Sequence, residues 1–163
     1  MKRWMRSYGR GLCGALLVLL CFEAGMRDAA DAKEYVNRRF GYRVDVPEDL
    51  FDSPEEAENE SGRTFVSRKD PEMKIRFSAV SGVTEVPNFK ETDIPPGAEK
   101  IESNELDQGY LLRYKVDGFA CVVVRRLENN VLYSAEFRCP QEKKEDYQEI
   151  CRAILISWVP LEE

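Results

Sequence analysis

Apolar and polar residues alternate along most of the chain after residue 40, which is the pattern of β-strands with one buried face. The first such strand contains Phe40, Tyr42, Val44 and Val46 and ends at Pro47. Three hairpins are predicted after it, formed by segments 63–67 with 73–80, 101–106 with 110–116, and 119–127 with 131–139. The pattern therefore predicts an antiparallel β-sheet of about six strands.

The last hairpin indicates which strand is central and where the chain turns. Val122, Val123 and Val124 are consecutive, so both faces of their strand should be covered. Asn129 and Asn130 separate the two strands, and asparagine tolerates the positive φ angles of a two-residue turn.

One long helix is predicted near the end of the chain. Apolar residues recur there at the spacing of a single helical face, at Tyr147, Ile150, Cys151, Ile154 and Trp158. Charged residues such as Glu149 occupy the other face, and Pro160 ends the helix. This helix should lie across one face of the sheet and cover it.

Two segments between the strands carry different signals. Ser53, Pro54 and Glu56 form a capping box with proline at the first helical position, which predicts a short N-terminal helix. Segment 81–100 contains three prolines and two glycines and shows no sustained period, so it should be a long irregular connection. The expected fold is α+β, with an antiparallel sheet covered by a long C-terminal helix and a short N-terminal helix.

Two motifs give the chain a resemblance to a known family. Residues 34–47 (EYVNRRFGYRVDVP) resemble the Tyr-x-Asn-x-x-Phe-Gly-Tyr-x-x-x-x-Pro opening of exported bacterial proteins of the PsbP-like (Mog-type) α/β-sandwich group, which includes DcrB-like lipoproteins. Residues 154–160 (ILISWVP) are similar to the closing helix of that group, with Trp158 where a phenylalanine usually closes the core. The resemblance implies a PsbP-like sandwich, and it carries over no catalytic residue because the group shares none.

The first 32 residues have the features of a secretory signal peptide. Segment 1–10 has four basic residues and no acid, and segment 11–22 is an apolar run of twelve residues. A helix of that length spans ~18 Å, less than the ~30 Å core of a bilayer. Ala30 and Ala32 fit the small-x-small rule, so cleavage is expected between Ala32 and Lys33, leaving a single domain at 33–163 that does not span a membrane.

Two other fates of this N-terminus remain as alternatives. The segment could stay attached as an uncleaved anchor, or Cys21 could become the acylated residue of a lipoprotein. Lipid anchoring at Cys21 is disfavoured because Leu20 precedes it, where lipoprotein processing needs a small residue. A periplasmic or secreted location is the expectation.

Charge and composition exclude several classes of partner and chemistry. The net charge is −6, and the first 32 residues contain five basic and three acidic residues, so the mature domain carries −8. Such a charge repels nucleic acid and anionic lipid. The chain has no histidine, which excludes Ser-His-Asp and Cys-His pairs and zinc sites that need histidine.

Three cysteines remain after cleavage, and an exported protein meets an oxidising compartment. We expect a disulfide between Cys121 and Cys139 and a buried free thiol at Cys151. The pairing needs a one-residue shift of the last hairpin, because the unshifted register places Cys121 opposite Arg138. Pairs that include Cys151, or no disulfide at all, stay open as alternatives. Cys139 could instead be a reactive thiolate at the start of the helix, although no histidine base is present.

The remaining charged clusters and motifs do not indicate a metal site or a catalytic site. Residues 48–60 contain seven acids without a lysine or arginine, but the spacing of a calcium loop is missing, so a solvated surface is expected and no metal. Arg125 and Arg126 are interpreted as an exposed strand end. No phosphate-binding loop, nucleophile elbow or cofactor motif is present, and no cofactor is expected.

The expected function is that of an exported, non-catalytic binding or accessory module of the bacterial cell envelope. It would bind a protein or an envelope component through the sheet face or the 81–100 segment. The alternative is a small hydrolase that works with carboxylates and without histidine.

Overall fold

The computed structural model describes residues 32–57, 59–88 and 93–161 of the 163-residue chain. The first strands in these ranges are β1 (Ala32–Asn37), β2 (Tyr42–Pro47), β3 (Phe51–Glu56), β4 (Gly62–Ser67) and β5 (Lys74–Ser81). They are followed by β6 (Glu99–Leu106), β7 (Gly109–Val116), β8 (Phe119–Glu128) and β9 (Val131–Pro140). The described chain ends with the 3₁₀ helix η1 (Gln141–Lys143), the helix α2 (Lys144–Ser157) and β10 (Val159–Pro160).

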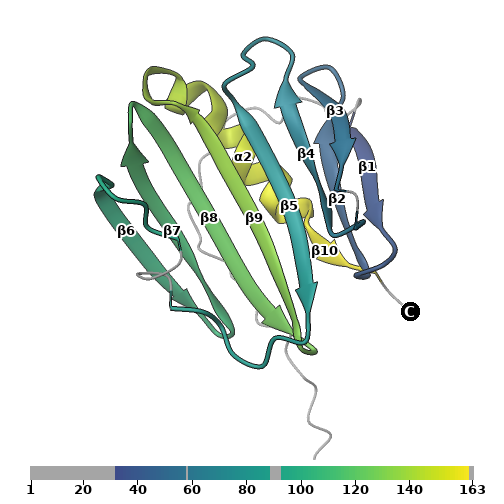
Figure 1. The fold of residues 1–163 in the computed structure, drawn as a ribbon. Coiled ribbons are helices and arrows are strands. Elements are labelled where there is room, and N and C mark those ends of the chain that lie inside the picture. Colours follow the sequence, from purple (N-terminus) through teal and green to yellow (C-terminus); the bar gives the residue numbers. More distant parts are fainter. Residues whose placement is uncertain (1–31, 58, 89–92, 162–163) are drawn as a thin grey trace, which may run out of the picture.

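The strands form two antiparallel sheets that lie in different layers (Figure 1). The large sheet has seven strands in the order β3-β4-β5-β9-β8-β7-β6, and the small sheet has three in the order β1-β2-β10. Helix α2 and the small sheet lie together against one face of the large sheet. We call this the inner face, and the opposite face of the large sheet the outer face.

The main core fills the space between these two layers, and the period-two pattern explains it. In β5, Ile75, Phe77 and Ala79 are buried, whereas Lys74 and Arg76 between them are exposed. The alternating residues of β2 and β9 are buried in the same cluster, together with Ile154 of α2. Helix α2 therefore covers the sheet as its apolar stripe predicts.

Trp158 closes this core from just beyond the end of α2. The residue is 5% exposed and adopts an extended conformation, so it follows the helix and does not belong to its last turn. Its ring centroid lies 5.5 Å from that of Phe77, 6.3 Å from that of Tyr42 and 6.4 Å from that of Tyr133. The chain then enters β10, which pairs with β2.

The outer face carries a second, smaller cluster over β7 and β8. Tyr110, Leu112 and Val123 are buried there, and Val86 and Ile94 of the β5–β6 connection pack against them. Val122 and Val124 belong to the inner-face cluster, so β8 is covered on both sides as its three consecutive valines predict. The long connection thus covers part of the sheet.

Two predictions about the elements are wrong. The capping box at Ser53 does not begin a helix, because residues 51–56 form the edge strand β3. Its pairing with β4 shifts register between Asp52 and Glu55, and such an irregularity on an edge strand accommodates Pro54. The large sheet has seven strands where about six were expected, and the first predicted strand, β2, belongs to a second sheet with β1 and β10.

The predicted Cys121–Cys139 disulfide is not present. Asn129 and Asn130 form the turn with φ angles of 51° and 61°, and the register pairs Cys121 with Arg138 and Cys139 with Ala120. The one-residue shift that the disulfide needs does not occur, so the two side chains point to opposite faces of the sheet. Cys121, Cys139 and Cys151 are all free thiols.

Candidate functional site

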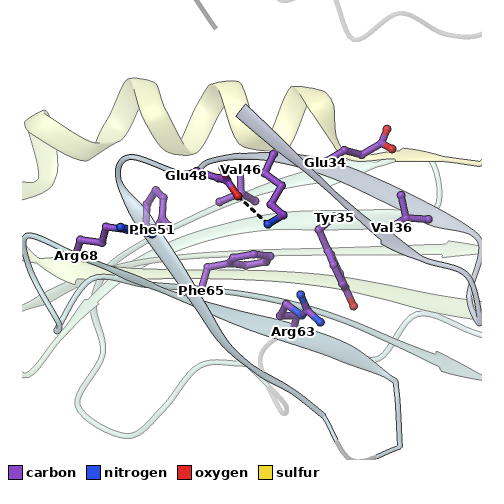
Figure 2. A pocket seen from close by; sticks show the side chains of 10 residues that line it. Glu34, Tyr35, Val36, Val46, Glu48, Phe51, Arg63, Phe65 and Arg68 are labelled. Atoms are coloured by element: carbon purple, nitrogen blue, oxygen red, sulfur yellow. Dashed lines mark ion pairs between the residues drawn. The ribbon is translucent and has the colours of Figure 1, made fainter. Parts of the chain in front are cut away.

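A hollow lies where the small sheet and the edge of the large sheet diverge (Figure 2). We call it the inter-sheet groove; its volume is about 500 Å³. Strands β1, β2, β3 and β4, with the residues that follow β2 and β4, contribute its lining, which consists of Lys33, Glu34, Tyr35, Val36, Val46, Glu48, Phe51, Arg63, Phe65 and Arg68.

The floor of the groove is apolar and mostly aromatic. Tyr35, Val46, Phe51 and Phe65 are each at most 7% exposed, so they are fixed by the core beneath them. The rings of Tyr35 and Phe65 meet edge to face, with centroids 5.7 Å apart. The sequence places these residues on the inward positions of four different strands, which is why no single stretch of sequence shows the floor.

The rim of the groove is charged, and ion pairs hold most of its side chains. Lys33 bonds Glu48 at 2.7 Å, and Arg68 bonds Asp52 at 2.9 Å. The hydrogen bond and positive charge of Lys33 lower the pKa of the Glu48 carboxyl. All four side chains are more than half exposed, so these pairs shape the rim and contribute little to stability.

Arg63 lies against the aromatic floor. Its guanidinium carbon is 4.8 Å from the centroid of the Tyr35 ring, which is a cation–π distance. Figure 2 shows Arg63 and Tyr35 side by side, reached from β4 and β1. The groove therefore presents an aromatic surface with the Arg63 guanidinium beside it.

One wall of the groove is the edge of β1. Lys33, Glu34, Tyr35 and Val36 are consecutive and all line the groove. Consecutive side chains of a strand point to opposite faces, so the groove must reach the edge of the strand itself. Among the described strands β1 pairs only with β2, so it is an edge strand, and edge strands are where an added strand can pair.

The groove contains only some of the residues singled out from the sequence. Lys33 lines it and Ala32 begins β1, but Cys121 and Cys139 lie elsewhere, on β8 and β9. Of the acidic run, Glu48 lines the groove. Within the described residues no group of three or more cysteine, aspartate or glutamate side chains could hold a metal ion. Cys21 and the apolar run at 11–22 lie outside the described residues.

The cysteines do not have the environment of a reactive thiolate. Burial raises the pKa of the Cys139 thiol to about 11 and that of the Cys151 thiol to about 12. Burial also raises the pKa of Cys121. At neutral pH all three are protonated, which is the opposite of what a nucleophilic cysteine needs.

Arg125 is not the exposed strand end expected from the sequence. Its side chain is 13% exposed and binds Asp93 of the β5–β6 connection through two nitrogens, Nε at 3.1 Å and Nη2 at 2.6 Å. Nη2 also binds Glu136 at 2.8 Å, and the Tyr110 hydroxyl donates to Asp93. Burial acts to lower the pKa of Arg125, but these hydrogen bonds outweigh it and raise the pKa. The cluster fastens the connection to the outer face.

No family model and no curated protein matches the chain. In the described part of the chain, no helix combines the length and apolar character needed to cross a bilayer.

Solved structures share the fold. The solution structure of cyanobacterial PsbP (CyanoP) from Synechocystis sp. PCC 6803 is similar with a TM-score of 0.53 and 12% identity, over 88% of this chain and 98% of that one. A crystal structure from Bacteroides thetaiotaomicron VPI-5482 is similar with a TM-score of 0.53 and 14% identity, over 82% of this chain and 50% of that chain. The chain has a PsbP-like fold, and at these identities the similarity concerns the fold alone.

Proposed function

We propose that this chain is an exported, non-catalytic binding module of the bacterial cell envelope, and that the inter-sheet groove receives an extended segment of a partner protein. The observation that carries the proposal is that β1 is an edge strand of the small sheet and runs beside an aromatic floor. An added strand takes its affinity from main-chain hydrogen bonds and its specificity from pockets for alternate side chains. The groove offers both.

The charges of the groove indicate what such a segment would carry. Apolar side chains would rest on Tyr35, Phe51 and Phe65, which are buried and therefore already in position. A carboxylate or a polar side chain would face Arg63, the guanidinium above the floor. Preformed sites of this kind lose little conformational entropy on binding.

The hydrolase alternative receives no support from the acids of the groove. A general acid needs a carboxyl group whose pKa is raised by an apolar setting. Glu48 is more than half exposed, and Lys33 lowers its pKa, so the side chain is ionised at neutral pH. A role in shaping the rim fits this environment better.

Export is part of the proposal and rests on the sequence. The basic segment 1–10, the apolar run 11–22 and the Ala30–Ala32 site support cleavage before Lys33, at the start of β1. The motif residues Tyr35, Asn37, Phe40, Gly41, Tyr42 and Pro47 support kinship with DcrB-like envelope proteins.

A photo-crosslinking experiment tests the groove. Val36 lines the groove, and Ile156 is 70% exposed on α2, so a photoreactive residue at position 36 probes the site and one at 156 serves as the matched control. Incubation with envelope extract should give a distinct cross-linked protein from position 36 alone. Arg63→Glu should abolish that product while the circular dichroism spectrum is unchanged. The same products from both positions, or none from position 36, would contradict the proposal.

A further inference from the structure

The outer face of the large sheet carries a cluster of positive charge on an acidic protein. Lys74 and Arg76 of β5 and Arg138 of β9 are exposed on this face, at the polar positions that alternate with the core. We call these three residues the basic patch. The whole chain has a net charge of −6, so the patch is a local reversal of sign.

The patch is arranged in a way that opposes stability. Lys74 lies directly opposite Arg138 in the pairing of β5 with β9. Like charges at directly opposite positions of an antiparallel pair repel each other and destabilise the sheet. An acidic residue at either position would relieve the repulsion, which suggests that the two cations serve another purpose.

Neighbouring acids do not neutralise the patch. Arg76 lies opposite Glu136, but the Glu136 carboxylate bonds Arg125 at 2.8 Å. Among the ion pairs of the described residues, none includes Lys74, Arg76 or Arg138. The guanidinium of Arg138 is instead held over the Phe119 ring, 3.6 Å from its centroid. The patch is therefore positively charged and partly preorganised.

A small hollow lies beside the patch on the β4–β5 side. Its volume is about 150 Å³, and Arg76 lines it together with Ser61, Thr64 and Ser78. Gly62 also lines it, and a side chain at Gly62 would meet the Phe77 carbonyl oxygen at 1.9 Å, so glycine is required for the close approach of the two strands. Hydroxyl groups beside a guanidinium suit a carboxylate, which accepts hydrogen bonds from both.

We propose that the outer face binds an acidic, extended peptide segment of a partner protein, with one carboxylate in the hollow beside Arg76 and others at Lys74 and Arg138. Positions i and i+2 of a strand, such as those of Lys74 and Arg76, lie ~6.6–7 Å apart, which is also the spacing of alternate acidic side chains in an extended peptide. The hollow shares Arg63 with the lining of the inter-sheet groove, but Lys74, Arg76 and Arg138 do not line that groove, so the proposal does not depend on the proposed function. An anionic membrane is disfavoured because the rest of the molecule is acidic.

Fluorescence anisotropy with a labelled peptide of four Glu-Thr repeats tests the proposal, with a Gln-Thr peptide as the neutral control. The Glu-Thr peptide should bind, the affinity should fall as salt rises, and the Gln-Thr peptide should not bind. Lys74→Gln combined with Arg138→Gln should weaken binding at least tenfold, and Arg76→Gln should weaken it severalfold. Arg113→Gln changes an exposed cation on the inner-face side of the same sheet, so binding should change by less than twofold.

Two further measurements separate this role from its rivals. Lys74→Gln should raise the urea midpoint while it weakens peptide binding, because it removes the repulsion from Arg138. The second measurement tests whether inorganic phosphate or phosphatidylglycerol vesicles bind the protein in place of the Glu-Thr peptide. Equal affinity of the Glu-Thr peptide for the wild type and the double variant would overturn the proposal. Binding of phosphate or vesicles through the patch without binding of the peptide would also overturn it.

Discussion

The Trp158 ring packs edge to face against three aromatic rings of the core, those of Tyr42, Phe77 and Tyr133. The helical spacing of the sequence predicted that Trp158 is buried but not which residues it contacts. Tyr42 and Phe77 belong to different sheets, so the indole holds the two layers together. A large buried side chain with partners on both sides leaves a cavity that neither layer can fill when it is removed.

Trp158→Ala should therefore lower the free energy of unfolding by about 3–5 kcal/mol. Glu149→Ala changes an exposed residue of α2 and should lower it by less than ~0.5 kcal/mol. Urea unfolding of the two variants gives the comparison. Equal midpoints would show that the indole does not join the two layers.

The buried thiols predict a loss of stability at alkaline pH. Burial raises the pKa of Cys139 to about 11 and that of Cys151 to about 12, from an ordinary value of 9.0. The folded protein keeps these protons longer than the unfolded chain, so their contribution is complete below about pH 9 and is lost as the pH rises through 11 and 12. In urea titrations above about pH 9, the free energy of unfolding should fall more steeply for the wild type than for Cys139→Ala.

The residues of the opening motif that carry the family resemblance have structural roles. Asn37 is 2% exposed; its amide oxygen accepts a hydrogen bond from the Phe40 N–H at 3.0 Å, and its amide nitrogen donates to the Glu60 carbonyl at 3.0 Å. Gly41 adopts a φ of 66°, which favours glycine. These residues shape the β1–β2 hairpin, so the motif predicted the fold correctly and could not indicate a binding site.

At the scale of elements, the sequence pattern predicted the long strands and the helix correctly, and it missed short or irregular strands at the edges of the sheets. The alternation in β5 and the stripe of α2 identified their buried faces because burial itself produces the pattern. Residues 53–56 fit the start of a helix, yet pairing with β4 makes them strand, and such tertiary pairing overrides local propensity. β10 has only two residues, too few to show any period.

The cluster of Arg125 and Asp93 joins the β5–β6 connection to the sheet, and its removal should be costly. Asp93 is 9% exposed, so Arg125→Ala leaves a nearly buried carboxylate without its cation. Loss of one partner of a buried pair typically costs about 3–5 kcal/mol. Glu136→Gln changes a partner that is 39% exposed and should cost less than ~1 kcal/mol.

A double variant distinguishes the charge effect from a packing effect in this cluster. Asp93→Leu with Arg125→Met replaces the pair by apolar side chains and should recover most of the stability lost by Arg125→Ala. Thermal or urea unfolding of the single and double variants measures this. A double variant as unstable as Arg125→Ala would show that packing, and not the unpaired carboxylate, is responsible.

At the scale of the whole molecule, the layers could be predicted but the groove could not. An amphipathic helix over an antiparallel sheet follows from two apolar patterns that must cover each other. The groove needs Tyr35, Phe51 and Phe65 to meet across two sheets, and the second sheet was not foreseen because residues 32–37 and 159–160 show little alternation. The alternation of apolar and polar residues within one segment does not show which distant segments that segment contacts.

Processing of the N-terminus is the prediction that concerns the whole chain. Cleavage after Ala32 should give a mature protein that begins at Lys33 and keeps the ion pair with Glu48. Intact-mass measurement of protein from the envelope fraction decides this. A mass that includes residues 1–32, or one that begins at an acylated Cys21, would contradict it.

The pairing of β10 with β2 also sets the order in which the molecule can be assembled. Val159 pairs with Arg43 and Pro160 with Tyr42, so residues more than a hundred positions apart complete the small sheet together. A ribosome or a translocation pore delivers residue 43 long before residue 159. The aromatic core of the emerging chain therefore stays incomplete and exposed until Trp158 is available. Contacts between residues so far apart in the sequence slow folding. During that interval the exposed strands are vulnerable to aggregation, and the chain is a natural client for chaperones.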